Sequence, residues 1–172
     1  MSEHAEAFIA HLNALKERDR GALAALRHSL AFEPGCYPKA FPYVERFAGA
    51  AVHERDAPRL AQYAVAGLFA RHPLQQAQSF ATALGKLMAR RQSQSVEGRF
   101  IALLGADAEN IVDYLRQAFS LLAADGIGCD YVRLLNDLSR WLNPSTDPSQ
   151  LRQRWARDFY RATQATHEST DA

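Results

Sequence analysis

The residues of this sequence that could do chemistry are chiefly its arginines. Among 20 basic residues, 17 are arginine and only three are lysine. Residues 57–106 hold six basic residues against one acid, residues 151–161 hold four against one, and residues 107–147 have an excess of four acids. A planar guanidinium binds phosphate oxygens in pairs and stacks on bases. The pattern favours a polyanion as ligand, although a GC-rich coding source, to which the 31 alanines also point, would enrich arginine by itself.

Helical spacing places several of these charges on common faces. Arg133 and Arg140 are seven residues apart, as are Arg20 and Arg27, so each pair shares one side of a helix. Lys86 and Arg90 share a side of another expected helix, and Arg154, Arg157 and Arg161 share a side of the last one. One basic face is more often solvated or ion-paired than ligand-binding, but four such faces in a near-neutral chain favour a groove for nucleic-acid phosphates. From the charge pattern alone, the candidate nucleic-acid-binding residues are Arg90, Arg91, Arg133 and Arg140.

No pattern typical of an enzyme or a metal site stands out. The six histidines include no HExxH pair, and the two cysteines are 93 residues apart without metal-binding or redox spacing. The GxG at Gly126 follows an expected helix instead of a strand, which gives no support to a dinucleotide-binding fold. We therefore expect a protein without catalytic residues, metal or cofactor.

Length and composition indicate a folded domain. With 172 residues, 48% hydrophobic residues and 23% charged residues, the chain can bury a core, and we expect one domain over residues 1–165 followed by a frayed tail at 166–172. The longest apolar run has seven residues, far short of the roughly 20 needed to cross a bilayer. The N-terminus lacks a basic segment followed by an apolar stretch, so we expect a cytoplasmic protein that does not bind membranes.

The hydrophobic periodicity predicts an all-α fold of about eight helices. Asp19 and Ser79 are predicted to cap helices that begin after them, and residues 32–42 to form a loop leading into a short helix at 43–47. A polar link at residues 92–95 suggests two small helical lobes, with a boundary near 92–106, as an alternative to a single bundle.

Four segments resemble a known family in their order along the chain. They are DRGALAALR at residues 19–27, AGLFARHP at 66–73, SVEGRFIALL at 95–104 and RQRWARDFY at 152–160. Together with the chain length they resemble CasB, the small-subunit family of the type I-E CRISPR surveillance complex Cascade. The resemblance covers residues 5–161, and none of the segments is a catalytic signature.

The resemblance implies a non-catalytic, all-helical subunit present in two copies in a ribonucleoprotein complex for antiviral defence. Its implied partners are the crRNA, the target and displaced DNA strands, and the backbone and large subunits of Cascade. The family's basic motif positions correspond to Arg27, Lys86 and Arg99 here. His28 stands where a second basic residue often follows in the family, and an ordinary histidine is mostly neutral at pH 7.

Two alternatives remain at this point. A helical scaffold could use its arginines as anchors in purely protein–protein contacts, without touching nucleic acid. The arginines at 154, 157 and 161 could bind nucleic acid, or could form ion pairs within the chain. A helical hydrolase would need a buried polar cluster that the sequence does not contain.

Overall fold

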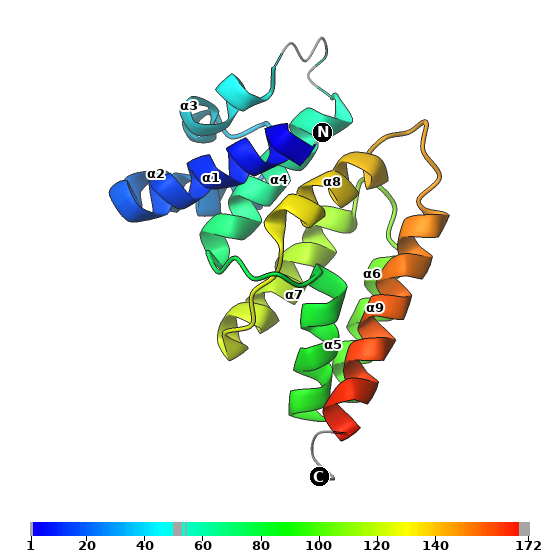
Figure 1. The fold of residues 1–172 in the computed structure, drawn as a ribbon. Coiled ribbons are helices and arrows are strands. Elements are labelled where there is room, and N and C mark those ends of the chain that lie inside the picture. Colours follow the sequence, from blue (N-terminus) through cyan, green and yellow to red (C-terminus); the bar gives the residue numbers. More distant parts are fainter. Residues whose placement is uncertain (1, 50–52, 54, 169–172) are drawn as a thin grey trace. The chain divides into compact units, whose positions relative to one another are not determined.

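The prediction of an all-α fold is confirmed. The computed structural model describes residues 2–49, 53 and 55–168, with side chains described for residues 3–49, 53 and 55–165. This part of the chain forms nine α-helices and three short 3₁₀ helices and contains no strand, only an isolated bridge between Gln75 and Cys129 (Figure 1). The helices divide into two compact units, and neither unit is continuous in sequence.

The first unit comprises Met1–Pro73 and Tyr131–Thr146. Its helices are α1 (Ser2–Arg18), α2 (Arg20–His28), α3 (Phe41–Val44), α4 (Ala57–Arg71) and α8 (Tyr131–Trp141), with the 3₁₀ helices Ser29–Ala31, Pro38–Ala40 and Glu45–Phe47.

The core of the first unit surrounds α4, in which every residue from 61 to 70 is buried. A helix that is apolar on all sides must be covered on all sides. Helix α8 supplies part of the cover, because the ring of Tyr131 lies edge-on to Phe69 at 5.2 Å and its hydroxyl donates to the carbonyl of His72. The first unit therefore depends on a helix that lies some 60 residues further along the chain.

The second unit comprises Leu74–Asp130 and Asp147–Ala172. Its helices are α5 (Phe80–Arg91), α6 (Gln94–Leu104), α7 (Ile111–Asp125) and α9 (Ser149–Glu168).

In the second unit, α5 and α9 lie side by side and run in the same direction (Figure 1). Gly85 lets their backbones approach, since a Cβ there would stand 2.4 Å from the carbonyl oxygen of Phe159 and 2.9 Å from the Cβ of Ala162. Aromatic rings fill the space behind this contact: Phe80 packs on Trp155, and Phe100 of α6 stacks on Phe159 at 4.1 Å. This pairing fixes which faces of α5 and α9 remain exposed.

Both predicted helix caps are confirmed. The Asp19 carboxylate accepts from the amide of Ala22 at 2.9 Å, and the Ser79 hydroxyl accepts from the amide of Thr82 at 3.1 Å. The short helix predicted at 43–47 begins earlier than expected, since helical turns already start at Pro38 and run through Phe47. A proline in the first turn lacks only an amide that would have no partner there, so Pro38 and Pro42 start turns instead of preventing them.

Residues 92–106, where the sequence suggests a lobe boundary, lie inside the second unit. Helix α9 continues to Glu168, into the segment predicted as a frayed tail, and residues 169–172 lie outside the described part. Over the described residues, no helix combines the length and apolar character needed to cross a membrane, and no group of three or more histidine, cysteine or acidic side chains could hold a metal ion.

Candidate nucleic-acid interface

All seven predicted site residues are exposed, and the fold distributes them over both units. The first unit carries Arg27 on α2 and Arg133 and Arg140 on α8. Arg27 also donates from Nε to the carbonyl oxygen of Ala70 at 3.4 Å, a long contact that leaves the rest of its guanidinium exposed. The second unit carries the other four: Lys86, Arg90, Arg91 and Arg99.

The three basic residues of α5 differ in what they contact. Lys86 donates to the side-chain oxygen of Gln78 at 2.6 Å, a neutral partner that leaves its charge uncompensated. Arg90 donates to the backbone carbonyl of Asp125 at 2.9 Å, and its charge contributes to lowering the pKa of the Asp125 carboxyl. Arg91 forms an ion pair with the Asp125 carboxylate, with 3.1 Å between Nε and Oδ1. This hydrogen-bonded pair raises the pKa of Arg91 and lowers that of Asp125.

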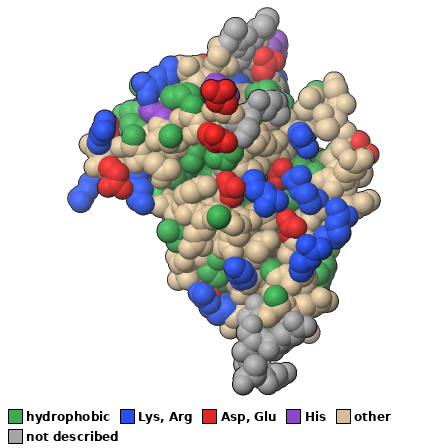
Figure 2. All heavy atoms as spheres, viewed as in Figure 1, with side chains coloured by type: hydrophobic (Ala, Val, Ile, Leu, Met, Phe, Trp, Pro, Cys, Tyr) green, Lys and Arg blue, Asp and Glu red, His purple; other side chains and the backbone are tan. Residues whose placement is uncertain are grey.

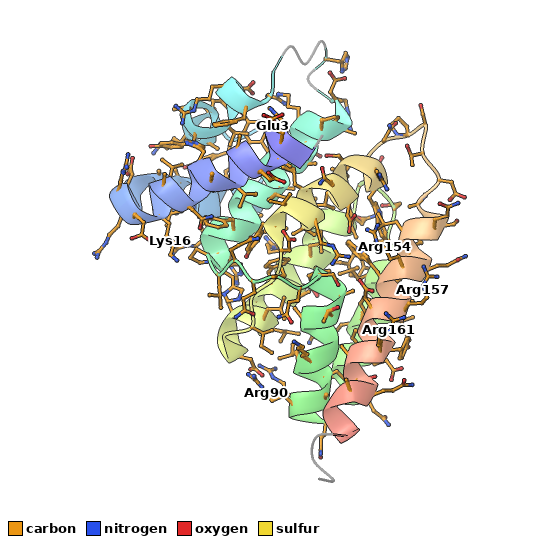
Figure 3. All side chains as sticks on the ribbon, in the orientation of Figure 1. Glu3, Lys16, Arg90, Arg154, Arg157 and Arg161 are labelled. Atoms are coloured by element: carbon orange, nitrogen blue, oxygen red, sulfur yellow. The ribbon has the colours of Figure 1, made fainter. Side chains whose placement is uncertain are left out.

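Helix α9 presents arginines to solvent beside α5. Arg157 and Arg161 are exposed and contact no acidic side chain in the part of the chain that the structure describes, whereas Arg154 is half-buried. Figure 3 shows Arg154, Arg157 and Arg161 following one another along the helix. The ion-pair alternative for these arginines therefore has no support at positions 157 and 161.

A hydrogen bond between α5 and α9 determines which of their charges share a side. The Ser79 hydroxyl at the start of α5 donates to the Asp158 carboxylate of α9 at 2.8 Å and contacts the Thr82 hydroxyl at 2.9 Å. Lys86 follows Thr82 by one helical turn, and Arg161 follows Asp158 by nearly one. The basic side chains of the two parallel helices thus lie along the same exposed side.

We call this surface the α5–α9 basic face. Its members are Lys86, Arg90, Arg154, Arg157 and Arg161, with Asp158 as the acid among them. In the space-filling view, Lys and Arg side chains gather over these two helices (Figure 2). Parallel rows of cations on neighbouring helices are a suitable surface for the phosphates of a nucleic-acid strand, because such binding is mostly electrostatic.

Arg99 lies on a different side of the second unit, at a pocket that the sequence analysis does not predict. The pocket lies between α5, α6 and α7 and has an empty volume of about 400 Å³, part of it open to solvent. Tyr114 and Gln117 of α7 also line it. A phenol on the flank of a strongly apolar helix was the one sequence signal that could have drawn attention to this place.

Over the described residues, the fold and the charges define a class: an all-helical protein built of two discontinuous units, with basic side chains along two parallel helices. Residues 22–160 match the family model described as CRISPR-associated protein Cse2. The chain belongs to this Cse2 family, for which CasB is the other name that its relatives carry. The resemblance noted in the sequence is thereby confirmed.

Relatives support this assignment along nearly the whole chain. The CRISPR-associated protein Cse2 of Thermus thermophilus is 44% identical over 149 residues, which are 86% of this chain and 83% of the relative. The crystal structure of CasB from Thermus thermophilus is similar with a TM-score of 0.76 and 41% identity, over 91% of this chain and 97% of that one. A chain in a structure described as a CRISPR RNA-guided surveillance complex has a TM-score of 0.82 over 98% of both chains, and at 21% identity this likeness concerns the fold.

Proposed function

We propose that this protein is the small subunit of a type I-E CRISPR surveillance complex, Cascade, and that it binds nucleic acid without catalysing a reaction. Membership of the Cse2 family supports the assignment to such a complex. The α5–α9 basic face carries the proposal of nucleic-acid binding, above all through Arg157 and Arg161, which are exposed and have no acidic partner among the described residues.

The role that fits this surface is support of strands held by their phosphates. When an RNA guide displaces one strand of a DNA duplex, the heteroduplex formed is about as stable as the duplex lost. A protein that holds the displaced strand electrostatically can shift this balance without reading sequence. The proposed partners are therefore the crRNA, the target and displaced strands, the backbone and large subunits of the complex, and a second copy of this chain, all in the cytoplasm.

A salt titration tests the proposal. Binding of single-stranded DNA to the purified protein is measured over a range of salt concentrations, for the native chain and for Lys86→Ala, Arg157→Ala and Arg161→Ala. Each phosphate contact contributes about 0.7 to the slope of log K against log salt for a single strand, so each variant should lose that amount. Affinity should fall equally for all base sequences.

Lys16→Ala and Arg18→Ala are matched controls, because both side chains are exposed cations at the end of α1, outside the proposed surface. They remove the same charge and should leave the slope unchanged. If the native protein showed no salt-dependent binding, the alternative of a helical scaffold with purely protein–protein contacts would replace this proposal.

A further inference from the structure

The pocket of the second unit has an apolar floor. It is lined by Leu84 of α5, Val96, Arg99 and Ala102 of α6, and Tyr114, Gln117, Ala118 and Leu121 of α7. Aliphatic side chains form the floor of the pocket, and the ring of Tyr114, which is 37% exposed, lies at its entrance. Its empty volume of about 400 Å³ includes open solvent, so the pocket is a partly open site at the surface.

The polar groups lie at the rim. Arg99 and Gln117 are exposed, and Arg99 has no acidic side chain within 4 Å among the described residues. The nearest acid in sequence, Glu97, accepts a hydrogen bond from the hydroxyl of Tyr160 at 2.8 Å. The guanidinium of Arg99 is therefore available to an anion from outside the chain.

Further cations lie where the groove between α5 and α7 ends. Arg91 follows Leu84 by seven residues on the same face of α5, and Asp125 follows Leu121 by four on the same face of α7. The ion pair between Arg91 and Asp125 therefore lies one to two turns beyond the pocket. Arg90, which donates to the backbone carbonyl of Asp125, adds a second positive charge there, so two cations face one carboxylate.

We propose that this pocket receives an unpaired nucleobase of single-stranded nucleic acid, with Arg99 binding an adjacent phosphate. The inference rests on the proposed nucleic-acid function and specifies a second site for it. A base suits both parts of the pocket: its π-face packs on Tyr114 and the aliphatic floor, and its edge offers donors and acceptors to the Gln117 amide. An aliphatic side chain of a partner protein would fill the floor but use neither the amide nor the guanidinium.

The test compares two single strands of equal length, a thymidine oligonucleotide and an abasic oligonucleotide, bound to the purified full chain at low salt. Stacking of one base changes affinity about 5- to 140-fold, so the native protein should prefer the thymidine strand by such a factor. Ala102→Leu, which fills the pocket, and Tyr114→Ala, which removes the ring, should bring this preference close to one. Their salt slopes should equal that of the native protein, since all cations are kept.

Two further variants serve as controls. Tyr114→Phe keeps the ring and should keep the preference, and Ala124→Leu adds the same bulk as Ala102→Leu at an exposed position of α7 outside the pocket. Thermal unfolding of each variant verifies that it is folded.

Failures of the two proposals give different results. If Ala102→Leu and Tyr114→Ala bind both strands with the native preference and salt slope, the pocket does not hold a base, a protein side chain becomes the better occupant, and the proposed function stands. If the native chain binds neither strand at low salt, the proposed function is contradicted, and the base pocket with it.

Discussion

The carboxylate of Asp125 determines how much of the positive charge on α5 is available to bind phosphate. Asp125 neutralises Arg91, one of the seven predicted site residues, while its backbone carbonyl accepts from Arg90. Both side chains of the pair are at the surface, where the attraction between them is weak and sensitive to salt. A phosphate could compete with such a carboxylate for the same guanidinium.

Asp125→Asn should therefore strengthen binding of single-stranded DNA. The substitution frees Arg91, and a further phosphate contact would increase the salt slope by about 0.7. Asp113→Asn is the matched control, because it removes one negative charge from an exposed position of the same helix that has no ion-pair partner among the described residues. Equal gains in the two variants would show that net charge, and not release of Arg91, is responsible.

His11 makes the stability of the first unit depend on pH. Its Nε2 donates to the carbonyl of Tyr43 at 2.9 Å, so Nδ1 must be the unprotonated nitrogen, which accepts from Arg46 at 2.5 Å. Partial burial lowers the pKa of His11, the hydrogen bond to Tyr43 opposes this, and the charge of Arg46 lowers it further. The folded state therefore favours neutral His11.

We expect the first unit to lose stability as the pH falls below about 6.5, the ordinary pKa of histidine. Between that value and the lower pKa of folded His11, the unfolded chain binds more protons than the folded chain, so the free energy of unfolding rises with pH in this window. Urea unfolding across this range should show a smaller pH dependence in His11→Gln than in the native protein. An identical pH dependence would assign the effect to other histidines.

At the scale of the elements, the second unit depends on the close approach of α5 and α9. A Cβ on Gly85 would stand 2.4 Å from the carbonyl oxygen of Phe159, and a backbone atom cannot move aside as the end of a flexible side chain can. The hydroxyl of Tyr160 on α9 donates to the Glu97 carboxylate on α6 and so connects the two helices. This hydrogen bond raises the pKa of Tyr160.

Gly85→Ala should destabilise the protein by about 1–3 kcal/mol, the usual cost of overpacking. Gly98→Ala in α6 is the control, because nothing beyond the adjoining backbone of its own helix lies within 4 Å of its Cβ position. Alanine should stabilise that helix by about 0.5–1 kcal/mol. Chemical denaturation measures both effects. A Gly85→Ala variant as stable as the native protein would mean that α5 and α9 can move apart without a decrease in the free energy of unfolding.

The sequence allowed the helices to be predicted better than their pairing. Apolar spacing and the side chains of Asp19 and Ser79 located most helices, because helix formation and capping depend on neighbouring residues. The contact of α5 with α9 joins residues more than 70 positions apart, and periodicity indicates which face is buried but not what covers it.

The candidate nucleic-acid interface also depends on which helices pack together, and this packing could not be predicted from the sequence. Charge counting found the basic segments and the family motifs located Lys86 and Arg99, but only the α5–α9 contact brings Lys86 and Arg161 to one side. The pocket could not be predicted, because its lining comes from three helices whose order of packing no local pattern records.

At the scale of the whole molecule, the path of the chain is the dominant feature. The first unit is interrupted after Pro73 and resumes at Tyr131, where α8 covers α4. Without α8, the ring of Phe69 would lose Tyr131, and part of the buried surface of α4 would be exposed to water.

Residues 1–73 alone should therefore fail to fold cooperatively. Joining residues 1–73 to residues 131–146 through a short Gly/Ser linker should restore a cooperative unfolding transition, because the Tyr131 hydroxyl reaches the carbonyl of His72 and the two chain ends lie close together. Circular dichroism during thermal unfolding compares the two fragments. A sharp transition in residues 1–73 would contradict the role given to α8.

The interrupted path also has a consequence for biosynthesis. Ribosomes add roughly 5–20 residues per second, so about 4 to 15 s pass between the emergence of Pro73 and that of Thr146. During this interval the nascent α4 lacks its covering helix, and α5 still lacks α9. Neither unit is complete during this interval, so chaperones that shield apolar segments of nascent chains have segments of both units to protect at once.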